Sequence, residues 1–242
     1  MNNPLISIIT VSYNAVNTIE QTILSVINQT YPNIEYIIID GGSTDGTVDI
    51  IKKYADKIAY WVSEPDKGIY DAMNKGIVKA SGEWINFMNS GDTFFSNETI
   101  SLINFEKAIN SLIIYGDNIN ILNDNINTYR KASKLTNIKY GMIFCHQSSF
   151  VRNTNNKDII FDSHYKICAD YNLFLGLYNK YGTKCFFYFP FPIAKYDNIY
   201  GISTNYKFNL YLEKITIHYK NKYYFSIIID IIIYLLIIFK LK

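Results

Sequence analysis

The chain has 242 residues, of which 49% are hydrophobic and 18% are charged, and its formal net charge is +2. This composition excludes an intrinsically disordered chain, and residues 1–203 lack the basic patch expected of a nucleic-acid-binding protein. The N-terminus has no basic stretch typical of a signal peptide, and the three cysteines form no C-x-x-C pair. We therefore expect a cytoplasmic protein without disulfides or a zinc site.

Alternating strands and helices are predicted over residues 1–100. The apolar run from Leu5 to Val11 is typical of a parallel strand buried on both faces. Asn17 can cap a helix whose apolar positions recur every three or four residues, and Pro32 closes it. Further strands are predicted at 36–39, 58–62 and 84–88, and further helices at 48–57 and 69–79. Repeated β-α units indicate an α/β fold with a mostly parallel sheet.

Two acidic loops directly follow predicted strands. Asp40 and Asp45 come after the strand at 36–39, and Asn89-Ser-Gly-Asp92 follows the strand at 84–88. In open α/β sheets, ligands bind at the carboxyl ends of the strands. Carboxylates at this edge indicate a metal ion or a polyhydroxylated ligand. Because Asp45 is better placed to cap the next helix, we assign the binding role to Asp40 and a structural role to Asp45.

After residue 100 the pattern is less regular. A long helix is predicted at 165–181, and Gly201-Ile-Ser203 marks a loop. Residues 204–242 carry six lysines against Glu213 and Asp230, which gives this segment a local charge of +4. We therefore predict a first domain at 1–203 and a separate basic and apolar tail at 204–242.

A set of short motifs, in a fixed order, carries a family resemblance. The motifs are Ser7-Ile-Ile-Thr-Val-Ser-Tyr-Asn14, Ile39-Asp-Gly-Gly-Ser-Thr-Asp-Gly-Thr47, Glu64-Pro-Asp-Lys-Gly68, Asn74-Lys-Gly76, Gly82-Glu-Trp-Ile85, Asn89-Ser-Gly-Asp92 and Ala169-Asp170. Each motif alone is weak, but the ordered set is specific. Over residues 5–203 the chain resembles the family 2 glycosyltransferases of the bacterial surface-polysaccharide type. The resemblance implies a GT-A catalytic domain, in which helices flank a single mostly parallel mixed sheet that binds a nucleotide-sugar.

The resemblance implies a donor pocket near the first motifs. Tyr13 offers a ring on which uracil can stack, a contact worth about 1–3 kcal/mol; a tyrosine packed in the interior is the alternative. Asp40 lies where the family holds the nucleoside, with an Asx turn as the alternative. The same likeness places Lys67 and Asp71 beside the donor, and Asn89 on a ribose or on a water bound to the ligand.

The Asn89-Ser-Gly-Asp92 segment occupies the place of the family's D-x-D motif, which holds a divalent ion on the donor diphosphate. One or two carboxylates plus phosphate oxygens suffice for Mg²⁺ or Mn²⁺. Here Asn89 stands at the first acidic position and Gly91 at the usual metal-binding position. Asp92 is therefore the candidate metal ligand. A metal-free turn built from Asn, Gly and Asp is the alternative.

Asp170 matches the family's catalytic aspartate at the start of a helix beneath the acceptor site. A desolvated carboxylate is basic enough to take the acceptor's hydroxyl proton; an aspartate favoured by the helix dipole is the alternative. Ala169 stands where many relatives carry an acid. His146 and Gln147 resemble a segment near the diphosphate and the acceptor, although a lone histidine is more often an ordinary hydrogen-bonded residue.

The C-terminal tail indicates a membrane surface. Residues 227–239 are apolar except for Asp230 and are followed by Lys240 and Lys242. A helix of this length reaches roughly 20 Å, which is short of the ~30 Å hydrocarbon core. We therefore expect an amphipathic or apolar helix that attaches peripherally to anionic lipids, with Tyr223 and Tyr224 at its entrance. A buried C-terminal helix or a dimer contact is the alternative.

Together these features predict an inverting, metal-dependent hexosyl- or N-acetylhexosaminyltransferase. It would move a sugar from a UDP-sugar to a hydroxyl of a glycan or lipid-linked acceptor in surface polysaccharide synthesis, at the inner face of the cell membrane. The alternative is a nucleotide-sugar-binding or assembly protein that has lost catalysis, an interpretation that the altered D-x-D segment keeps open. No glycine-rich phosphate loop follows a predicted strand, which weakens the nucleotidyltransferase, kinase and dehydrogenase interpretations.

Overall fold

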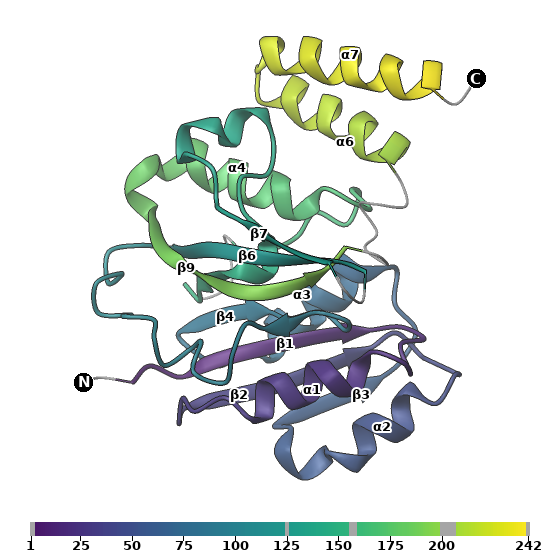
Figure 1. The fold of residues 1–242 in the computed structure, drawn as a ribbon, viewed down its shortest axis with the longest axis vertical. Helices are drawn as coiled ribbons and strands as arrows, with labels where there is room; N and C mark the ends of the chain where they lie inside the picture. Colours follow the sequence, from purple (N-terminus) through teal and green to yellow (C-terminus); the bar gives the residue numbers. More distant parts are fainter. Residues whose placement is uncertain (1–2, 124–125, 155–158, 199–206, 241–242) are drawn as a thin grey trace.

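A single mixed sheet forms the centre of the protein (Figure 1). The computed structural model describes residues 3–123, 126–154, 159–198 and 207–240. Within these residues the strands are β1 (Ile6–Ser12), β2 (Ile34–Asp40), β3 (Tyr60–Ser63), β4 (Trp84–Phe87), β5 (Thr93–Phe94), β6 (Ile113–Asn123), β7 (Ile126–Arg130), β8 (Ser149–Arg152) and β9 (Phe186–Asp197). Their order across the sheet is β3-β2-β1-β4-β8-β6-β9-β5, and β7 pairs with β6.

The sheet changes from parallel to mixed along its width. Strands β3, β2, β1 and β4 are parallel, β8 runs antiparallel to both β4 and β6, and β9 runs parallel to β6. The α-helices are α1 (Ile19–Ile27), α2 (Thr47–Lys53), α3 (Ile69–Lys79), α4 (Ala169–Tyr181), α6 (Lys207–Lys220) and α7 (Tyr224–Lys240). Short 3-10 helices are η1 (Ala55–Lys57), η2 (Leu135–Tyr140), η3 (His146–Ser148) and η4 (Thr183–Cys185). This architecture confirms the predicted α/β class with a mixed sheet between helices.

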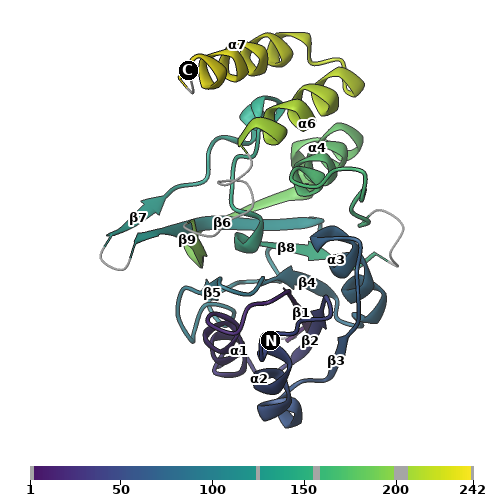
Figure 2. The ribbon, with the colours of Figure 1, turned by 90° about the vertical axis from the view of Figure 1, so that its right-hand side faces the viewer.

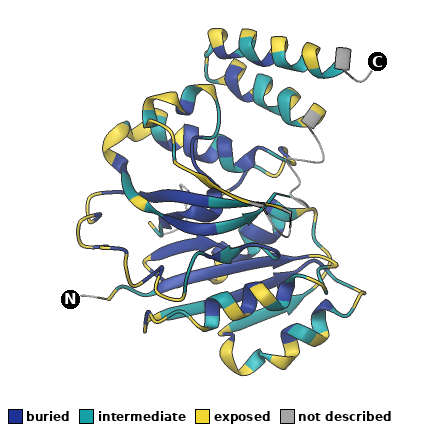
Figure 3. Ribbon diagram, in the orientation of Figure 1, coloured by how far each residue is buried: buried dark blue, intermediate teal, exposed yellow. Residues whose placement is uncertain are grey.

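Each face of the sheet carries its own hydrophobic core. Ile6 and Ile8 of β1 join a cluster with α1 and α2, whereas Ile9 and Val11 join a second cluster with α3 and α4. All residues of β1 are buried, as Figure 3 shows for the central strands. Each fully buried isoleucine contributes about 1.5–3 kcal/mol. The strand is thus fixed from both sides, and its carboxyl end is held at a defined edge.

Most elements predicted for residues 1–100 are found within two residues of their predicted ends, and α3 has the predicted bounds. The prediction of one helix at 48–57 is wrong, because the helix breaks at Tyr54 into α2 and η1. Asn17 does not cap α1. The helix instead starts from a backbone turn in which the N–H groups of Thr18 and Ile19 both donate to the carbonyl of Ala15.

The helix predicted at 165–181 begins only at Ala169. The backbone N–H groups of Lys166, Ile167 and Cys168 donate to the carboxylate of Glu213 in α6, at 2.7–3.0 Å. These residues therefore form a loop around a distant side chain instead of a first helical turn. This loop places Asp170 in the first turn of α4.

The tail packs against the rest of the molecule. Figures 1 and 2 show α7 as the outermost helix, with α6 between it and α4. A buried chain of contacts joins these helices: the Tyr171 hydroxyl lies 2.7 Å from His218 Nε2, and His218 Nδ1 lies 2.6 Å from Asp230 Oδ2. Lys214 Nζ donates to the other oxygen of Asp230 at 2.7 Å. The alternative of a packed C-terminal helix therefore holds for the inner side of α7.

The division of the chain into 1–203 and 204–242 stays a prediction, because the loop at 201–203 lies outside the described residues. Among the helices that the structure describes, none combines the length and the apolar character needed to cross a bilayer.

Candidate active site

A cavity of about 1490 Å³ opens at the carboxyl ends of β1, β2 and β4. Tyr13 follows β1, Gly41 follows β2, and Asn89 and Asp92 follow β4, and all of them line the cavity. Its other walls include the start of α3, the end of β9, η3, the start of α4 and one side of α6. This is the edge at which open α/β sheets bind ligands. The volume exceeds the roughly 300–1,000 Å³ of common small-molecule sites, so there is room for two ligands.

Most of the residues predicted for the site line this one cavity. They are Tyr13, Asn89, Asp92, His146, Gln147 and Asp170. The remaining predicted residues, Asp40, Lys67 and Asp71, are not part of its lining. The structure thus brings six side chains from distant parts of the sequence into one cavity. The other three predicted residues lie outside its lining.

Asp40 is fully buried beneath the loop that follows β2. Its carboxylate accepts hydrogen bonds from the hydroxyls of Ser12, Ser43 and Ser63 and from the backbone N–H groups of Gly42 and Ser43, at 2.6–3.1 Å. Burial acts to raise the pKa of Asp40, but these hydrogen bonds outweigh it and hold the pKa below its usual value. The arrangement is that of an aspartate that closes a turn. Asp40 therefore shapes the cavity floor from below.

Lys67 and Asp71 lie together at the start of α3. Asp71 Oδ2 accepts the backbone N–H of Lys67 at 3.0 Å and lies 3.9 Å from Lys75 Nζ. The carboxylate is thus engaged by the chain leading into its own helix, where the helix dipole favours a negative charge.

Asp66 is the acidic residue beside Tyr13 that sequence reasoning did not single out. A Cβ atom on Gly41 would lie 2.5 Å from Asp66 Oδ2 and 3.3 Å from Tyr13 Cδ2. Only glycine at this position lets the carboxylate and the ring meet above the loop. Tyr13 is 67% exposed, so one side of its ring is open to a ligand. In the sequence, the glycine directly after Asp40 is the feature that corresponds to this contact. Its role becomes clear only in the structure, which places the distant Asp66 over Gly41.

Asp92 is buried at the base of the loop after β4. It accepts hydrogen bonds from Gln147 Nε2 at 2.7 Å and from the backbone N–H of Asp197 at 2.9 Å. Burial chiefly, with the nearby negative charge of Asp197, raises the pKa of Asp92 to about 7. Gly91 has a φ of 100°, a conformation that favours glycine, and a Cβ there would lie 3.6 Å from Asp197 Oδ2. Asp197, from the end of β9, therefore brings a second carboxylate to the altered D-x-D segment.

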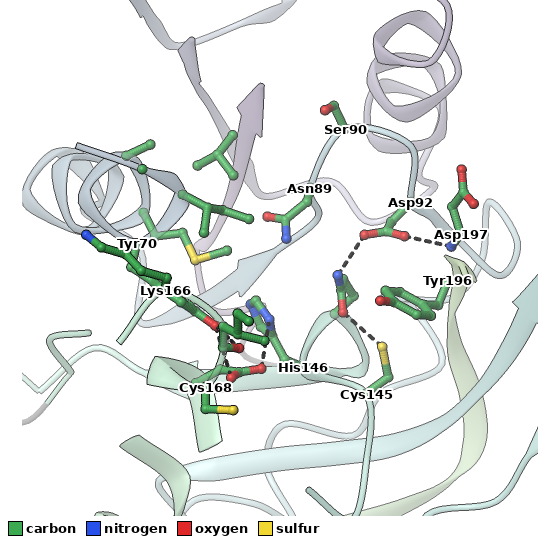
Figure 4. Close-up of a pocket in the computed structure, with 18 of the residues that line it drawn as sticks. Tyr70, Asn89, Ser90, Asp92, Cys145, His146, Lys166, Cys168, Tyr196 and Asp197 are labelled. Atoms are coloured by element: carbon green, nitrogen blue, oxygen red, sulfur yellow. Dashed lines mark hydrogen bonds and ion pairs between the residues drawn. The ribbon is translucent and has the colours of Figure 1, made fainter. Parts of the chain in front are cut away.

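Side chains that carry oxygen atoms, Asn89, Asp92 and Asp197, lie on the same side of the cavity (Figure 4). The Oδ1 atom of Asn89 is buried and has no hydrogen-bond partner among the described residues. Carboxylate and amide oxygens are the ligand types that Mg²⁺ or Mn²⁺ prefers, and both oxygens of Asp92 here accept hydrogen bonds from Gln147 and Asp197. The described residues contain no group of three His, Cys, Asp or Glu side chains that could hold a metal by themselves. An ion here would take further ligands from water or from a bound phosphate.

Asp170 and His146 face each other at another wall of the cavity. Asp170 Oδ2 lies 3.7 Å from His146 Nδ1, and Oδ1 accepts hydrogen bonds from the Tyr70 hydroxyl at 3.2 Å and from the Tyr171 N–H at 2.8 Å. Burial raises the pKa of Asp170 and lowers the pKa of His146. A carboxylate with a raised pKa beside a neutral imidazole is suited to accept a proton.

Helix η3 connects the two corners of the cavity. Its first residue, His146, faces Asp170, and the next residue, Gln147, donates to Asp92. Cys145 Sγ lies 2.8 Å from Gln147 Oε1 and so fixes the orientation of the amide. The predicted pair His146-Gln147 thus touches both candidate carboxylates, a geometry that no local sequence pattern reveals.

Comparison with known proteins places the chain in a family. The family model described as glycosyl transferase family 2 matches residues 7–173. An uncharacterized glycosyltransferase of Mycobacterium tuberculosis is 43% identical over 99 residues, which make up 40% of this chain. That match spans only 38% of the relative's length.

Solved structures show the same fold. S. aureus TarS in complex with UDP is similar with a TM-score of 0.68 and 20% identity, over 88% of this chain and 64% of that chain. The mannosyltransferase PcManGT from Pyrobaculum calidifontis, in complex with GDP-Man and Mn²⁺, also has a TM-score of 0.68, with 15% identity, over 91% of this chain and 64% of that chain. The predicted GT-A fold is confirmed by this likeness. Since the family model spans most of the catalytic fold from β1 into α4, the chain belongs to glycosyl transferase family 2.

Proposed function

We propose that the cavity binds a nucleotide-sugar, by preference a UDP-sugar, and that the protein transfers the hexosyl or N-acetylhexosaminyl group to a hydroxyl of a glycan or lipid-linked acceptor. The observation that carries this proposal is the buried carboxylate of Asp170, with its raised pKa, in the same cavity as Tyr13 and Asp92. Family membership supports the reaction type. The solved relatives bind UDP and GDP-Man, which supports a nucleotide-sugar donor.

The donor base belongs at the end of the cavity formed by Tyr13 and Asp66. A base stacked on the exposed ring of Tyr13 can donate a ring N–H to the carboxylate of Asp66. Asp40 contributes by holding the loop under this pocket. This assignment moves the direct base contact from Asp40 to Asp66, because the oxygens of Asp40 are already engaged by five hydrogen bonds.

Asp92, Asn89 and Asp197 are the residues that would hold a divalent cation. Such an ion supplies positive charge to the diphosphate as it leaves. Gln147 orients Asp92 from the opposite side through its amide hydrogen bond. The second carboxylate from Asp197 compensates for the acidic residue that Gly91 replaces. A PcManGT structure with Mn²⁺ supports the expectation of a metal at the family level.

Asp170 is the proposed general base for transfer with inversion. The acceptor hydroxyl oxygen attacks the anomeric carbon from the side opposite the diphosphate, its proton passes to Asp170 Oδ2, and the bond between carbon and phosphate oxygen breaks as the nucleoside diphosphate leaves. The Tyr70 hydroxyl and the Tyr171 N–H hold the other oxygen of Asp170 in place. No covalent enzyme intermediate is needed, since one carboxylate suffices for an inverting displacement.

The Asp170→Asn variant tests this proposal, because it keeps the shape of the side chain and removes the base. With a radiolabelled nucleotide-sugar, transfer should fall about 10²–10⁴-fold while nucleotide affinity is retained. Asp162→Asn is the matched control, since Asp162 bonds His164 outside the cavity lining and should leave transfer unchanged. Nuclear magnetic resonance of the product would report the anomeric configuration.

Transfer by Asp170→Asn at the rate of the unchanged protein would remove the proposed base. A retained anomeric configuration would refute inversion. If the unchanged protein bound nucleotide-sugars but turned none over, the alternative of a binding protein without catalysis would be favoured.

A further inference from the structure

Helix α7 is rich in apolar residues, and only one of its long sides is covered. The inner side carries Ser226 and Asp230, both buried against η2 and α6. The opposite side exposes a continuous stripe of large apolar side chains. This stripe consists of Phe225, Ile228, Ile231, Ile232, Leu235 and Leu236, which are 42–66% exposed. Helices that are apolar all round are normally buried in protein or lipid, so the stripe needs a partner.

The position of the stripe leaves it accessible. Figures 1 and 2 agree that α7 is the outermost layer of the molecule, and Figure 3 shows its exposed side facing away from α6. Phe225 meets the ring edge of Tyr140, which is itself 38% exposed and extends the apolar surface. The surface is therefore a long convex ridge, a shape suited to lying in a flat interface.

The charges of the tail are sorted between its two sides. Both acidic side chains of the described tail point inward: Glu213 accepts three backbone N–H groups before α4, and Asp230 is held by Lys214 and His218. Lys222, at the turn between α6 and α7, is exposed, whereas the exposed Lys220 extends its ammonium group over the ring of Tyr165. The outer surface of the tail thus combines apolar side chains with positive charge and presents no carboxylate side chain within the described residues.

We infer that this ridge binds the surface of a bilayer containing anionic lipids. Apolar side chains on one side of a helix insert at the boundary of head groups and acyl chains, and nearby lysines gain from a negative surface. A second copy of the chain fits less well. In a two-fold dimer the same patch meets itself, and a second copy would bring no carboxylate to the lysine, because Glu213 and Asp230 both point inward. Anionic lipids complement the lysines and the stripe together.

Helix α6 links this ridge to the cavity. Leu210, Tyr211 and Lys214 of α6 line the cavity, while the same helix packs against α7. A bilayer bound by α7 therefore lies one helix layer from the site. This inference goes beyond the proposed function, and it holds or fails independently of turnover because it concerns binding alone.

Vesicle flotation of the full chain tests the inference. The protein should float with vesicles of phosphatidylcholine and phosphatidylglycerol in equal amounts, and about tenfold less with phosphatidylcholine alone. The variant Ile228→Glu/Ile232→Glu should lose about tenfold or more of its binding to the anionic vesicles. The matched control is Val78→Glu/Ile109→Glu, which makes the same changes at apolar positions that are 75% and 67% exposed elsewhere, and it should float as the unchanged chain does.

Circular dichroism and UDP affinity would verify that both variants remain folded. Equal flotation of the two double variants would overturn the inference. So would a chain that does not float and forms a dimer in sedimentation analysis, with Ile228→Glu/Ile232→Glu returning it to a monomer, because the ridge would then be an interface between copies. Retained flotation with lost transfer would leave this inference standing and count against the proposed function alone.

Discussion

In the cavity wall and beneath its floor, identical carboxyl groups are placed in opposite environments. Asp40 receives five hydrogen bonds, and its pKa is held below the usual value. Asp170 and Asp92 receive fewer, so burial dominates and raises the pKa of both. Groups with perturbed pKa values in a cleft are candidates for chemistry, whereas a fully hydrogen-bonded aspartate is more often structural. The difference between these aspartates is set by the groups that surround each one in the folded structure, and the sequence motifs alone do not reveal it.

The rate of transfer should depend on pH through Asp170. The base works only when ionised, and burial raises its pKa above the ~3.9 of an exposed aspartate. The value of kcat at saturating donor and metal should therefore fall as the pH drops through this raised pKa, starting at a higher pH than for an exposed carboxylate. A pH profile of kcat measures this. A profile that stays flat down to the ordinary titration range of aspartate would argue against Asp170 as the base.

Gly41→Ala should weaken nucleotide binding without unfolding the protein. The added Cβ would lie 2.5 Å from Asp66 Oδ2 and push that flexible carboxylate away from Tyr13. Loss of one charge-assisted hydrogen bond, about 1.5–3 kcal/mol, corresponds to about tenfold or more in the affinity for UDP. Isothermal titration calorimetry would measure it.

Gly176→Ala is the control for that substitution. Gly176 lies in α4 with no atom within 4 Å of an added Cβ, so UDP affinity should stay the same. Stability should rise by about 0.5–1 kcal/mol, as expected for alanine in a helix interior. Equal UDP affinity in the Gly41→Ala variant would show that Asp66 does not contact the base.

At the scale of elements, the predictions succeeded where local sequence pattern decides the structure and failed where contacts between distant segments decide it. The strands β1, β2, β3 and β4 were predictable because their apolar runs are buried on one or both faces whatever lies beyond them. The start of α4 was not predictable, because the segment before it binds the carboxylate of Glu213 through three backbone N–H groups, and Glu213 lies in the distant helix α6. The burial of Asp230 was not predictable from local pattern either, because its partners Lys214 and His218 come from the preceding helix.

Asp230→Asn should strongly destabilise the packing of α6 and α7. It leaves the ammonium group of Lys214 without a carboxylate in a largely buried position. Breaking a buried pair by removing one partner costs about 3–5 kcal/mol. Asp56→Asn is the matched control, because Asp56 pairs with Lys57 in an exposed position and should change the free energy of unfolding by less than about 0.5 kcal/mol. Urea unfolding would measure the free energy of unfolding of both variants. Similar midpoints for the two variants would show that the buried pair does not support the tail.

Across the whole molecule, the sequence motifs point to the edge of the sheet where the cavity lies but not to the complete lining of that cavity. The loops after β1, β2 and β4 meet at one edge because those strands are parallel neighbours, a consequence of the β-α pattern. Asp66 and Asp197 reach the cavity from a loop and from the far end of β9; Asp66 lies in the motif Glu64-Pro-Asp-Lys-Gly68, but nothing local marks its position over Gly41, and Asp197 has no local signal. The long-range pairing of β9 with β6 decides where Asp197 lies. Such contacts between distant segments cannot be read from spacing.

The tail also proved closer to the site than its composition suggested. Residues 204–242 stood out as a basic and apolar segment, and this contrast predicted a separate unit. The structure places Leu210 and Lys214 of this segment in the cavity lining and His218 against Tyr171, the neighbour of Asp170, and the division itself stays a prediction. One helix of the tail therefore completes the cavity, and the other presents the exposed ridge.

The most direct test of the central claim is the release of nucleoside diphosphate from a panel of UDP- and GDP-sugars, with Mn²⁺, with Mg²⁺ and with a chelator. We expect saturable turnover of at least one sugar nucleotide that the chelator reduces and that both Asp170→Asn and Asp92→Asn lower by about 10²-fold or more. Turnover that both substitutions leave unchanged would contradict the claim that these carboxylates form the active site. No turnover of any sugar nucleotide by the unchanged chain would contradict the proposed reaction itself.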